Sequence, residues 1–196
     1  MPLNDSEIRP TLISFLNNSK KKTDVVIEEL PVCFGNAIAD IVFVDKSFHC
    51  YEIKGETDSI SRIHHQALFY NQSFQNISLV TTSNHIKYAS CNVPPYWGII
   101  VAELAENNMI KLKRIRKASS NPCFSKEKAL QTLWKDEMLC IADREGLSVS
   151  KKMSKTSLSS ILSSSLSKTK TIEYISSLIC ERIKKKNLCT CMRCEN

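Results

Sequence analysis

Apolar residues follow two different periods along this chain, and the period changes several times. Six short runs rich in β-branched and aromatic residues are typical of strands. Between them, apolar residues recur every three to four positions, as in amphipathic helices. The predicted strands lie at residues 25–32, 38–44, 48–54, 77–82, 97–102 and 109–115. Because strands and helices interleave, we expect an α/β fold, an α/β/α sandwich around a mixed central sheet.

Pro10 bears on where the first helix begins. Asp5 or Ser6 could cap a helix at that point. A proline inside a helix removes a backbone hydrogen bond, so we expect regular structure to start nearer Arg9. Apolar spacing predicts further helices at residues 60–74, 129–141 and 172–186.

The last quarter of the chain differs in composition from the rest. Residues 148–167 contain ten serines, which is typical of a linker, although apolar residues in helical register leave a marginal helix open. We therefore predict three parts. They are a domain at 1–146, a serine- and lysine-rich linker or marginal helix at 147–168, and a basic helix with a cysteine-rich tail at 169–196.

The second and third predicted strands form a hairpin that gathers charged residues. If the link at residues 45–47 is a three-residue turn, Val44 faces Phe48 and Asp40 then faces Glu52. Directly opposed side chains lie ~5 Å apart at Cβ. Glu52 and Lys54 share a face because strand side chains alternate. The hairpin therefore brings two carboxylates and one ammonium group together.

Two carboxylates at this spacing repel each other unless a cation lies between them. Oxygen ligands favour Mg²⁺, with Mn²⁺ as the alternative, over softer metals. The other interpretation is a solvated strand end with an ordinary pair between Lys54 and Glu52. Two further features favour the metal site: acids at Glu28 and Glu29, and Gln66 four residues before Tyr70 on a predicted helix.

These residues together resemble the PD-(D/E)XK nuclease superfamily, with its restriction-endonuclease-like fold, in the branch with the RecB-type Gln-x-x-x-Tyr motif. The motif residues are Glu29, Asp40, Glu52-Ile53-Lys54 and Gln66-x-x-x-Tyr70. More narrowly, the strings Ala-Asp-Ile, Tyr-Glu-Ile-Lys and Asp-Ser-x-x-Arg resemble a small uncharacterised bacterial family within it. The resemblance is good from about residue 28 to residue 80. One departure is Ala39, where the superfamily usually has proline.

The resemblance implies a magnesium-dependent nuclease that hydrolyses phosphodiester bonds in DNA. Asp40, Glu52 and the Ile53 carbonyl would bind the metal. Glu29 would complete the acidic cluster directly or through water, with Glu28 as its rival because strand register decides which one points inward. Lys54 would orient or deprotonate the attacking water.

Gln66 and Tyr70 would position the DNA strand or the water, and without the resemblance they would be helix side chains that face the sheet. The alternative function is a catalytically silent module of the same fold that binds DNA or a protein partner.

Charge is unevenly spread along the chain. Residues 1–100 hold 8 Lys and Arg against 10 Asp and Glu, whereas residues 101–196 hold 19 against 10. An acidic pocket beside a basic surface suits a protein that binds DNA, but a solvated basic tail explains the charge equally well. A homodimer would suit cleavage of both strands.

Composition sets the remaining expectations. The chain has 196 residues and 42% apolar residues, which suits one domain with a core. No stretch reaches the roughly 18 apolar residues of a membrane span, and the first residues lack the pattern of a signal peptide. We therefore expect a cytoplasmic protein with no membrane partner.

Nine cysteines are spread through the chain, and without an export signal we expect reduced thiols. Cys189, Cys191 and Cys194, with Cys180, could bind zinc and organise a binding protein. The resemblance adds a further option, an iron–sulfur cluster that would include Cys33. The cysteine spacing is irregular, so we expect neither zinc nor a cluster.

Overall fold

A six-stranded mixed sheet organises the protein in the computed structural model, which describes residues 2–18, 24–45 and 47–191. The strands lie in space in the order of the sequence. They are β1 (Val25–Val32), β2 (Ala37–Val44), β3 (Phe48–Lys54), β4 (Asn76–Thr82), β5 (Gly98–Leu104) and β6 (Ile110–Arg116). β1, β2 and β3 are antiparallel, β3, β4 and β5 are parallel, and β6 is antiparallel to β5. The predicted mixed sheet and its six strands are confirmed.

Seven α-helices accompany the sheet within the described residues. They are α1 (Asp5–Asn18), α2 (Ile63–Ser73), α3 (Ile86–Asn92), α4 (Lys126–Leu130), α5 (Lys135–Arg144), α6 (Lys155–Ser165) and α7 (Lys168–Cys191). The predicted α/β class is confirmed. The sequence pattern did not reveal α3, which has only seven residues.

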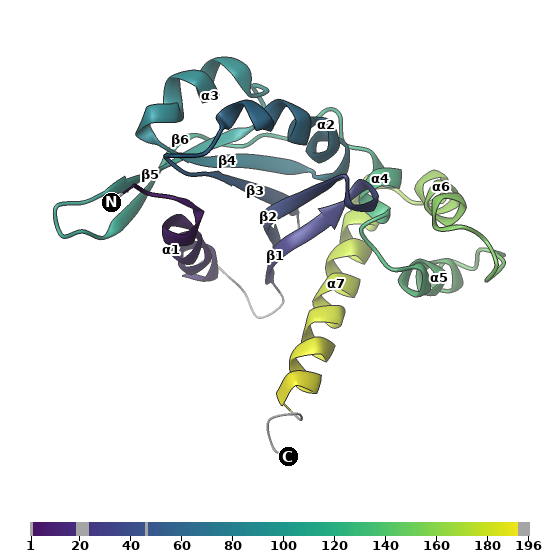
Figure 1. The fold of residues 1–196 in the computed structure, drawn as a ribbon. Helices are drawn as coiled ribbons and strands as arrows, with labels where there is room; N and C mark the ends of the chain where they lie inside the picture. The colour runs from purple at the N-terminus through teal and green to yellow at the C-terminus, as the bar shows by residue number, and fades with distance from the viewer. Residues whose placement is uncertain (1, 19–23, 46, 192–196) are drawn as a thin grey trace.

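The helices cover the two faces of the sheet unequally, as Figure 1 shows. On one face, called here the α1 face, Ile8 and Leu12 of α1 pack with Ile41 and Val80 of the sheet. The opposite face, called the α2 face, carries the larger core, to which α2, α3 and the helices α4 to α7 contribute. Both faces of the sheet are therefore buried at its centre.

The first helix begins at Asp5, so the prediction of a start nearer Arg9 was wrong. The N–H of Asn4 donates to Glu7 Oε2 (2.9 Å), and the Asn4 carbonyl accepts from the N–H of Ile8 (3.1 Å). These bonds stabilise the first turn before Pro10 is reached. Pro10 has no backbone N–H, which leaves one carbonyl of the preceding turn without its helical partner. Because Pro10 is exposed, water can bind that carbonyl.

The predicted helix at residues 129–141 is two helices, because the chain turns at Thr132–Trp134. Trp134 has extended backbone (φ −73°, ψ 158°), and its N–H donates to Glu137 Oε2 (2.6 Å) at the start of α5. A carboxylate three residues into a helix commonly caps it in this way. The apolar spacing continued across the break, and therefore concealed it.

Helix α6 lies within the segment predicted as a linker or marginal helix (147–168), and α7 covers much of the predicted basic helix and tail (169–196). Both pack on the core, whereas the division of the chain into three parts stays a prediction. Leu158 and Leu162 of α6 and Ile175 and Ile179 of α7 are buried in the core of the α2 face. The serines tolerate a helix because those on its exposed side bond to carbonyls three or four residues earlier, as Ser165 Oγ does to Ile161 (3.0 Å). The hydrophobic core does not break at residue 146.

Candidate active site

The hairpin of β2 and β3 has the predicted register. Val44 pairs with Phe48, and the last pair of the ladder is Ile41 with Tyr51. Asp40 and Glu52 occupy the next pair of positions. There the Asp40 side chain, in place of a backbone carbonyl of β2, bonds to β3. Asp40 Oδ2 accepts the backbone N–H of Ile53 at 2.7 Å. The Asp40 carboxylate therefore lies between the two strands.

An irregularity in β2 explains this orientation. Ala39 packs in the core of the α2 face, whereas Ile41 packs in the core of the α1 face. Residues two apart share a face in a regular strand, so the alternation reverses at Asp40. On β1, between residues that pair with Ile41 and Ala39, Glu29 has a φ of 54°. Both strands are thus distorted at the same level.

Glu52 is the centre of a buried hydrogen-bond network on the α2 face, with 0% of its surface exposed. Its Oε1 accepts from Lys54 Nζ and from Gln66 Nε2, the latter at 2.5 Å. The Tyr70 hydroxyl lies 2.8 Å from Glu52 Oε2 and 2.6 Å from the Ile38 carbonyl oxygen. A tyrosine has one hydroxyl proton, so Tyr70 shares it between the two acceptors.

Burial and the second carboxylate change the acidity of Asp40. Burial, followed by the charge of Glu52, raises the pKa of Asp40 to about 7, although the Ile53 N–H and Lys54 oppose the shift. Lys54 is only 12% exposed at its side chain. The two acids therefore lie close enough together that one of them binds a proton near neutral pH unless a cation is present.

Arg9 of α1 holds Asp40 from the other face of the sheet, a contact that the sequence analysis missed. Its Nη1 donates to the Asp40 carbonyl (3.0 Å), and its Nη2 lies 3.7 Å from Asp40 Oδ1. Asp5 anchors the guanidinium through two hydrogen bonds, at 3.0 and 2.6 Å. The spacing of Asp5 and Arg9 predicts a pair on one helix, but not the strand that the arginine reaches.

Glu28 and Glu29 do not join the acid pair. Both are exposed, and Glu28 Oε2 lies 3.6 Å from Arg9 Nη1 on the α1 side. Among the residues that the structure describes, no three acidic, histidine or cysteine side chains are grouped as a metal site would require. Of the predicted residues, the structure brings together Asp40, Glu52, Ile53, Lys54, Gln66 and Tyr70, and leaves Glu29 apart.

The donors of this site fit a hard divalent cation. Mg²⁺ is usually held by one or two carboxylates, with water and substrate oxygens as its other ligands, so Asp40 and Glu52 are enough. Gln66 offers a second indication: its Oε1 is buried and has no hydrogen-bond partner among the described residues. A buried acceptor of this kind is costly unless a donor reaches it, and a metal-bound water would supply one.

The predicted cysteine site falls mostly outside the described side chains, because those of Cys189, Cys191 and Cys194 are not among them. Cys33 is buried with its Sγ 3.4 Å from Ser73 Oγ, and Cys180 is buried on α7. The six cysteines whose side chains are described form no disulfide.

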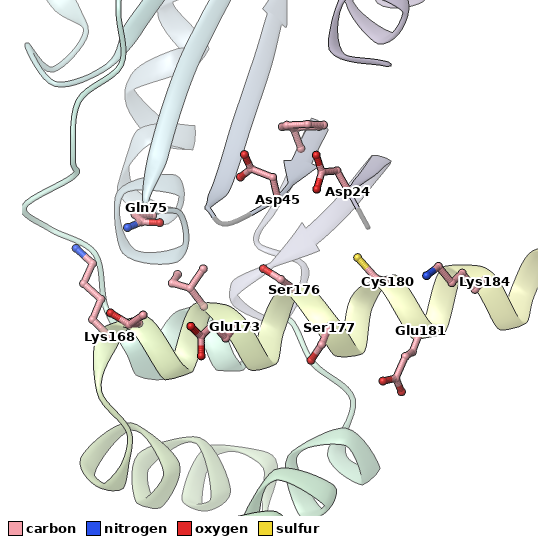
Figure 2. Close-up of a pocket in the computed structure, with 13 residues that line it drawn as sticks. Asp24, Asp45, Gln75, Lys168, Glu173, Ser176, Ser177, Cys180, Glu181 and Lys184 are labelled. Carbon is pink, nitrogen blue, oxygen red and sulfur yellow. The ribbon is translucent and has the colours of Figure 1, made fainter. Parts of the chain in front are cut away.

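A cavity of about 1040 Å³ lies away from the acid pair, between α7 and the ends of the strands (Figure 2). Asp24, Asp45 and Gln75 line it from the sheet side, and Ser176 and Lys184 from α7. None of the predicted catalytic or magnesium-binding residues lines it, although Cys180 does. No α-helix in the described ranges is both long and apolar enough to span a bilayer.

Comparison with known proteins gives a family and two similar proteins. The family model described as "Bacteriophage P4 protein cII" matches residues 2–195. Protein cII of Enterobacteria phage P4 is 25% identical over 174 residues, which are 88% of this chain and 65% of that protein. The chain thus spans about two thirds of the length of this relative. The SPO1766 protein of unknown function from Silicibacter pomeroyi is similar over 50% of this chain and 62% of its own, at 15% identity and a TM-score of 0.37.

Proposed function

We propose that this chain, which belongs to the bacteriophage P4 protein cII family, is a magnesium-dependent nuclease that hydrolyses DNA phosphodiester bonds. One observation carries the proposal. The buried Glu52 lies beside the half-buried Asp40, Lys54 is paired with Glu52, and the Gln66 oxygen lacks a donor among the described residues. A protein that only binds a partner gains nothing from two buried like charges, which destabilise each other.

The fold is consistent with a restriction-endonuclease-like sandwich, and we include that finer assignment in the proposal. Helix α1 covers one face of the mixed sheet and α2 the other. The acid pair lies on the adjacent strands β2 and β3, which α1 and α2 contact from opposite faces, so both helices can hold it. Arg9 comes from α1, and Gln66 and Tyr70 come from α2.

Asp40, Glu52 and the Ile53 carbonyl would hold the metal. Mg²⁺ or Mn²⁺, when bound, lowers the pKa of a water ligand and neutralises charge that develops on the phosphate. Ionised Asp40 is required for this role, and its raised pKa means that protons compete with the cation below about pH 7. Arg9 keeps the Asp40 backbone in place and lies too far from its carboxylate, at 3.7 Å, to replace the cation.

Lys54 would orient the attacking water and stabilise the phosphate charge. In the described conformation its ammonium group neutralises Glu52. When a divalent cation takes over that role, Lys54 becomes available to the water and to a phosphate oxygen. Gln66 Oε1, which has no partner among the described residues, could accept a hydrogen bond from the same water. The Tyr70 hydroxyl bonds to Glu52 Oε2 and so restrains the orientation of the carboxylate.

Glu29 has no direct place in this site, because it is exposed and its backbone is left-handed. In this proposal it acts only through water. The lack of a third acid in the described site also favours the second candidate, a catalytically silent module of the same fold that binds DNA. The two candidates differ in one measurable property, which is strand cleavage.

Cleavage of a panel of linear, circular, single-stranded and branched DNA with Mg²⁺ or Mn²⁺ tests the proposal. We expect the wild type to cut at least one substrate and Asp40→Ala and Lys54→Ala to lose about 100-fold or more of that activity. Lys113→Ala, which removes an exposed lysine of β6, is the matched control.

Equal activity of wild type, Asp40→Ala and Lys54→Ala would place any cleavage elsewhere and contradict the proposal. Binding of DNA without cleavage under every condition would favour the silent module instead. A homodimer is expected only if the enzyme cuts both strands of a duplex, and sedimentation with and without DNA tests that expectation.

A further inference from the structure

Two aromatic side chains are displayed to solvent on the same side of the sheet as the acid pair. Phe34 is 62% exposed and Trp134 is 61% exposed. The other tryptophan, Trp97, is fully buried. Apolar surface in water is unfavourable in proportion to its area, and large exposed apolar groups commonly mark binding sites.

Each of these aromatic rings has a cation beside it. The Arg182 guanidinium carbon lies 4.3 Å from the centre of the Trp134 ring, and Lys155 Nζ lies 6.0 Å from the centre of the Phe34 ring. Both distances are within the range of a cation–π contact. Glu137 fixes the guanidinium of Arg182 through a hydrogen bond of 2.9 Å to Nε and a second one to Nη2.

The two pairs belong to one surface, called here the aromatic platform (Phe34, Trp134, Lys155 and Arg182). Lys155 lies on α6, which packs against α5, the helix that begins directly after Trp134. The platform draws on three separate parts of the chain: the turn after β1, the start of α5, and helices α6 and α7. Figure 1 shows the end of β1 near the side where α4, α5 and α6 gather.

The backbone holds Phe34 in its exposed position. Cys33, Phe34 and Gly35 have φ values of 49°, 60° and 86° in succession, all in the left-handed region. Side chains other than glycine adopt that region at a steric cost. A segment that only connected β1 and β2 could avoid this cost with glycine at positions 33 and 34. Such a connection would also not need an aromatic side chain at the exposed position 34.

The platform lies within reach of the acid pair along β2. Asp40 is three residues beyond Ala37, where β2 begins, and a strand advances about 3.3 Å per residue. The turn that carries Phe34 is therefore roughly 10–15 Å from Asp40. Ile38 lies between them in sequence. Its carbonyl accepts from Tyr70, which also contacts Glu52.

We propose that the aromatic platform binds single-stranded polynucleotide, with bases stacked on Phe34 and Trp134 and the backbone near Lys155 and Arg182. Exposed aromatic rings interspersed with cations are the usual means of binding unpaired strands, because every base offers a face for stacking. A duplex keeps those faces inside. That the bound strand leads to Asp40 and Glu52 rests on the proposed function, whereas the binding itself does not.

Tryptophan fluorescence tests the proposal directly, because only two tryptophans are present and Trp97 is buried. Oligo(dT), oligo(rU) and a duplex of equal length are titrated into the full chain in EDTA, so that binding is measured without cleavage. We expect both single strands to quench the emission and the duplex to bind more weakly. The two single-stranded arms distinguish DNA from RNA.

Variants assign the binding to the platform. Phe34→Ala is expected to weaken oligo(dT) binding by at least about fivefold, and Trp134→Ala to do so and abolish the quenching. Trp134→Phe should retain most of the affinity, measured by anisotropy of a labelled strand. Lys155→Gln should reduce the slope of log K against log salt concentration by about 0.7. Phe15→Ala is the control, since Phe15 is an exposed aromatic residue of α1.

Two results would overturn the platform. One is oligo(dT) affinity that Phe34→Ala and Trp134→Ala leave unchanged. The other is binding of duplex as tight as that of single strands with the same insensitivity to these variants. If the surface docks a protein instead of a nucleic acid, oligo(dT) would not quench the emission, and that result too would contradict the proposal. Normal quenching together with cleavage that Asp40→Ala leaves unchanged, or with no cleavage of any substrate, would mean that the catalytic proposal fails and this one stands.

Discussion

The carboxylate of Asp40 takes the place of a backbone carbonyl in the sheet, where it accepts the N–H of Ile53 at 2.7 Å. One bond thus connects the end of the β2–β3 ladder to the candidate active site. Oδ2 is used in this bond, whereas Oδ1 lies 3.7 Å from Arg9 Nη2. Asp40 therefore combines a structural role with its proposed role as a ligand, and substitutions of it must be read for both.

The raised pKa of Asp40 predicts that stability falls as the pH rises. With a pKa of about 7 against an ordinary value of 3.8, Asp40 binds its proton more tightly in the folded chain. This contribution is complete below about pH 4 and is lost as the pH rises through 7. We expect the free energy of unfolding in EDTA, measured with urea, to fall over that interval by on the order of 2 kcal/mol.

Comparison with Asp40→Asn isolates that contribution from other groups. The difference in unfolding free energy between the wild type and Asp40→Asn should vary with pH, with a midpoint near 7. Asp143→Asn, at an exposed position of α5, should give a difference that stays constant. A constant difference for Asp40→Asn as well would show that Asp40 titrates normally.

Glu52→Gln should lower the pKa of Asp40, because the charge of Glu52 raises it. The substitution keeps the shape of the side chain and leaves an acceptor for Lys54. The pH midpoint attributed to Asp40 should then move below 7, as measured by the same urea titrations or by carboxyl carbon NMR shifts. An unchanged midpoint would mean that burial alone causes the shift.

Mg²⁺ should stabilise the protein above pH 7, where Asp40 is ionised. A ligand that binds only the folded state adds RT ln(1 + [L]/Kd) to stability, about 2.7 kcal/mol at 100-fold excess over Kd. We expect the thermal midpoint to rise with Mg²⁺ concentration in the wild type and to stay constant in Asp40→Asn. A rise of equal size in both proteins would indicate that the cation binds at another place.

The fold was largely readable from the sequence because its strands alternate clearly and its hairpin has a short polar link. The register that opposes Asp40 to Glu52 follows from Val44 and Phe48 alone. Local signals misled in two places, once where a capping pair outweighed a proline and once where a long-range contact ordered a serine-rich segment. Helix α1 begins before Pro10 because Asn4 and Glu7 cap it, and α6 is ordered because its leucines reach the core.

The candidate site was predictable in its chemistry and less so in its geometry. Asp40, Glu52, Lys54, Gln66 and Tyr70 come together as the motif implies. For Glu29, strand alternation could not foresee a left-handed residue, since a backbone reversal of this kind depends on both β1 and β2. Arg9 could not be identified because its partner is 31 residues away in sequence.

Tyr70→Phe should destabilise the protein through the groups that it leaves behind. Removal of the hydroxyl deprives the buried Glu52 Oε2 and the Ile38 carbonyl of a donor. Loss of a partner by buried acceptors costs about 1–3 kcal/mol. Urea unfolding at pH 7 measures the loss. Tyr88→Phe, whose hydroxyl bonds to His64 at an exposed position, should change stability by less than about 0.5 kcal/mol.

Ile175→Ala tests whether α7 belongs to the core rather than to a separate extension. Ile175 is fully buried on the α2 face, and truncation of a buried isoleucine to alanine costs about 2–5 kcal/mol. We expect a loss of that size in a single transition, seen at the same urea concentration by tryptophan fluorescence and by far-ultraviolet circular dichroism. Ser177→Ala, at an exposed position of the same helix, should have little effect. Two separate transitions, of which Ile175→Ala shifts only one, would show that α7 unfolds independently of the sheet.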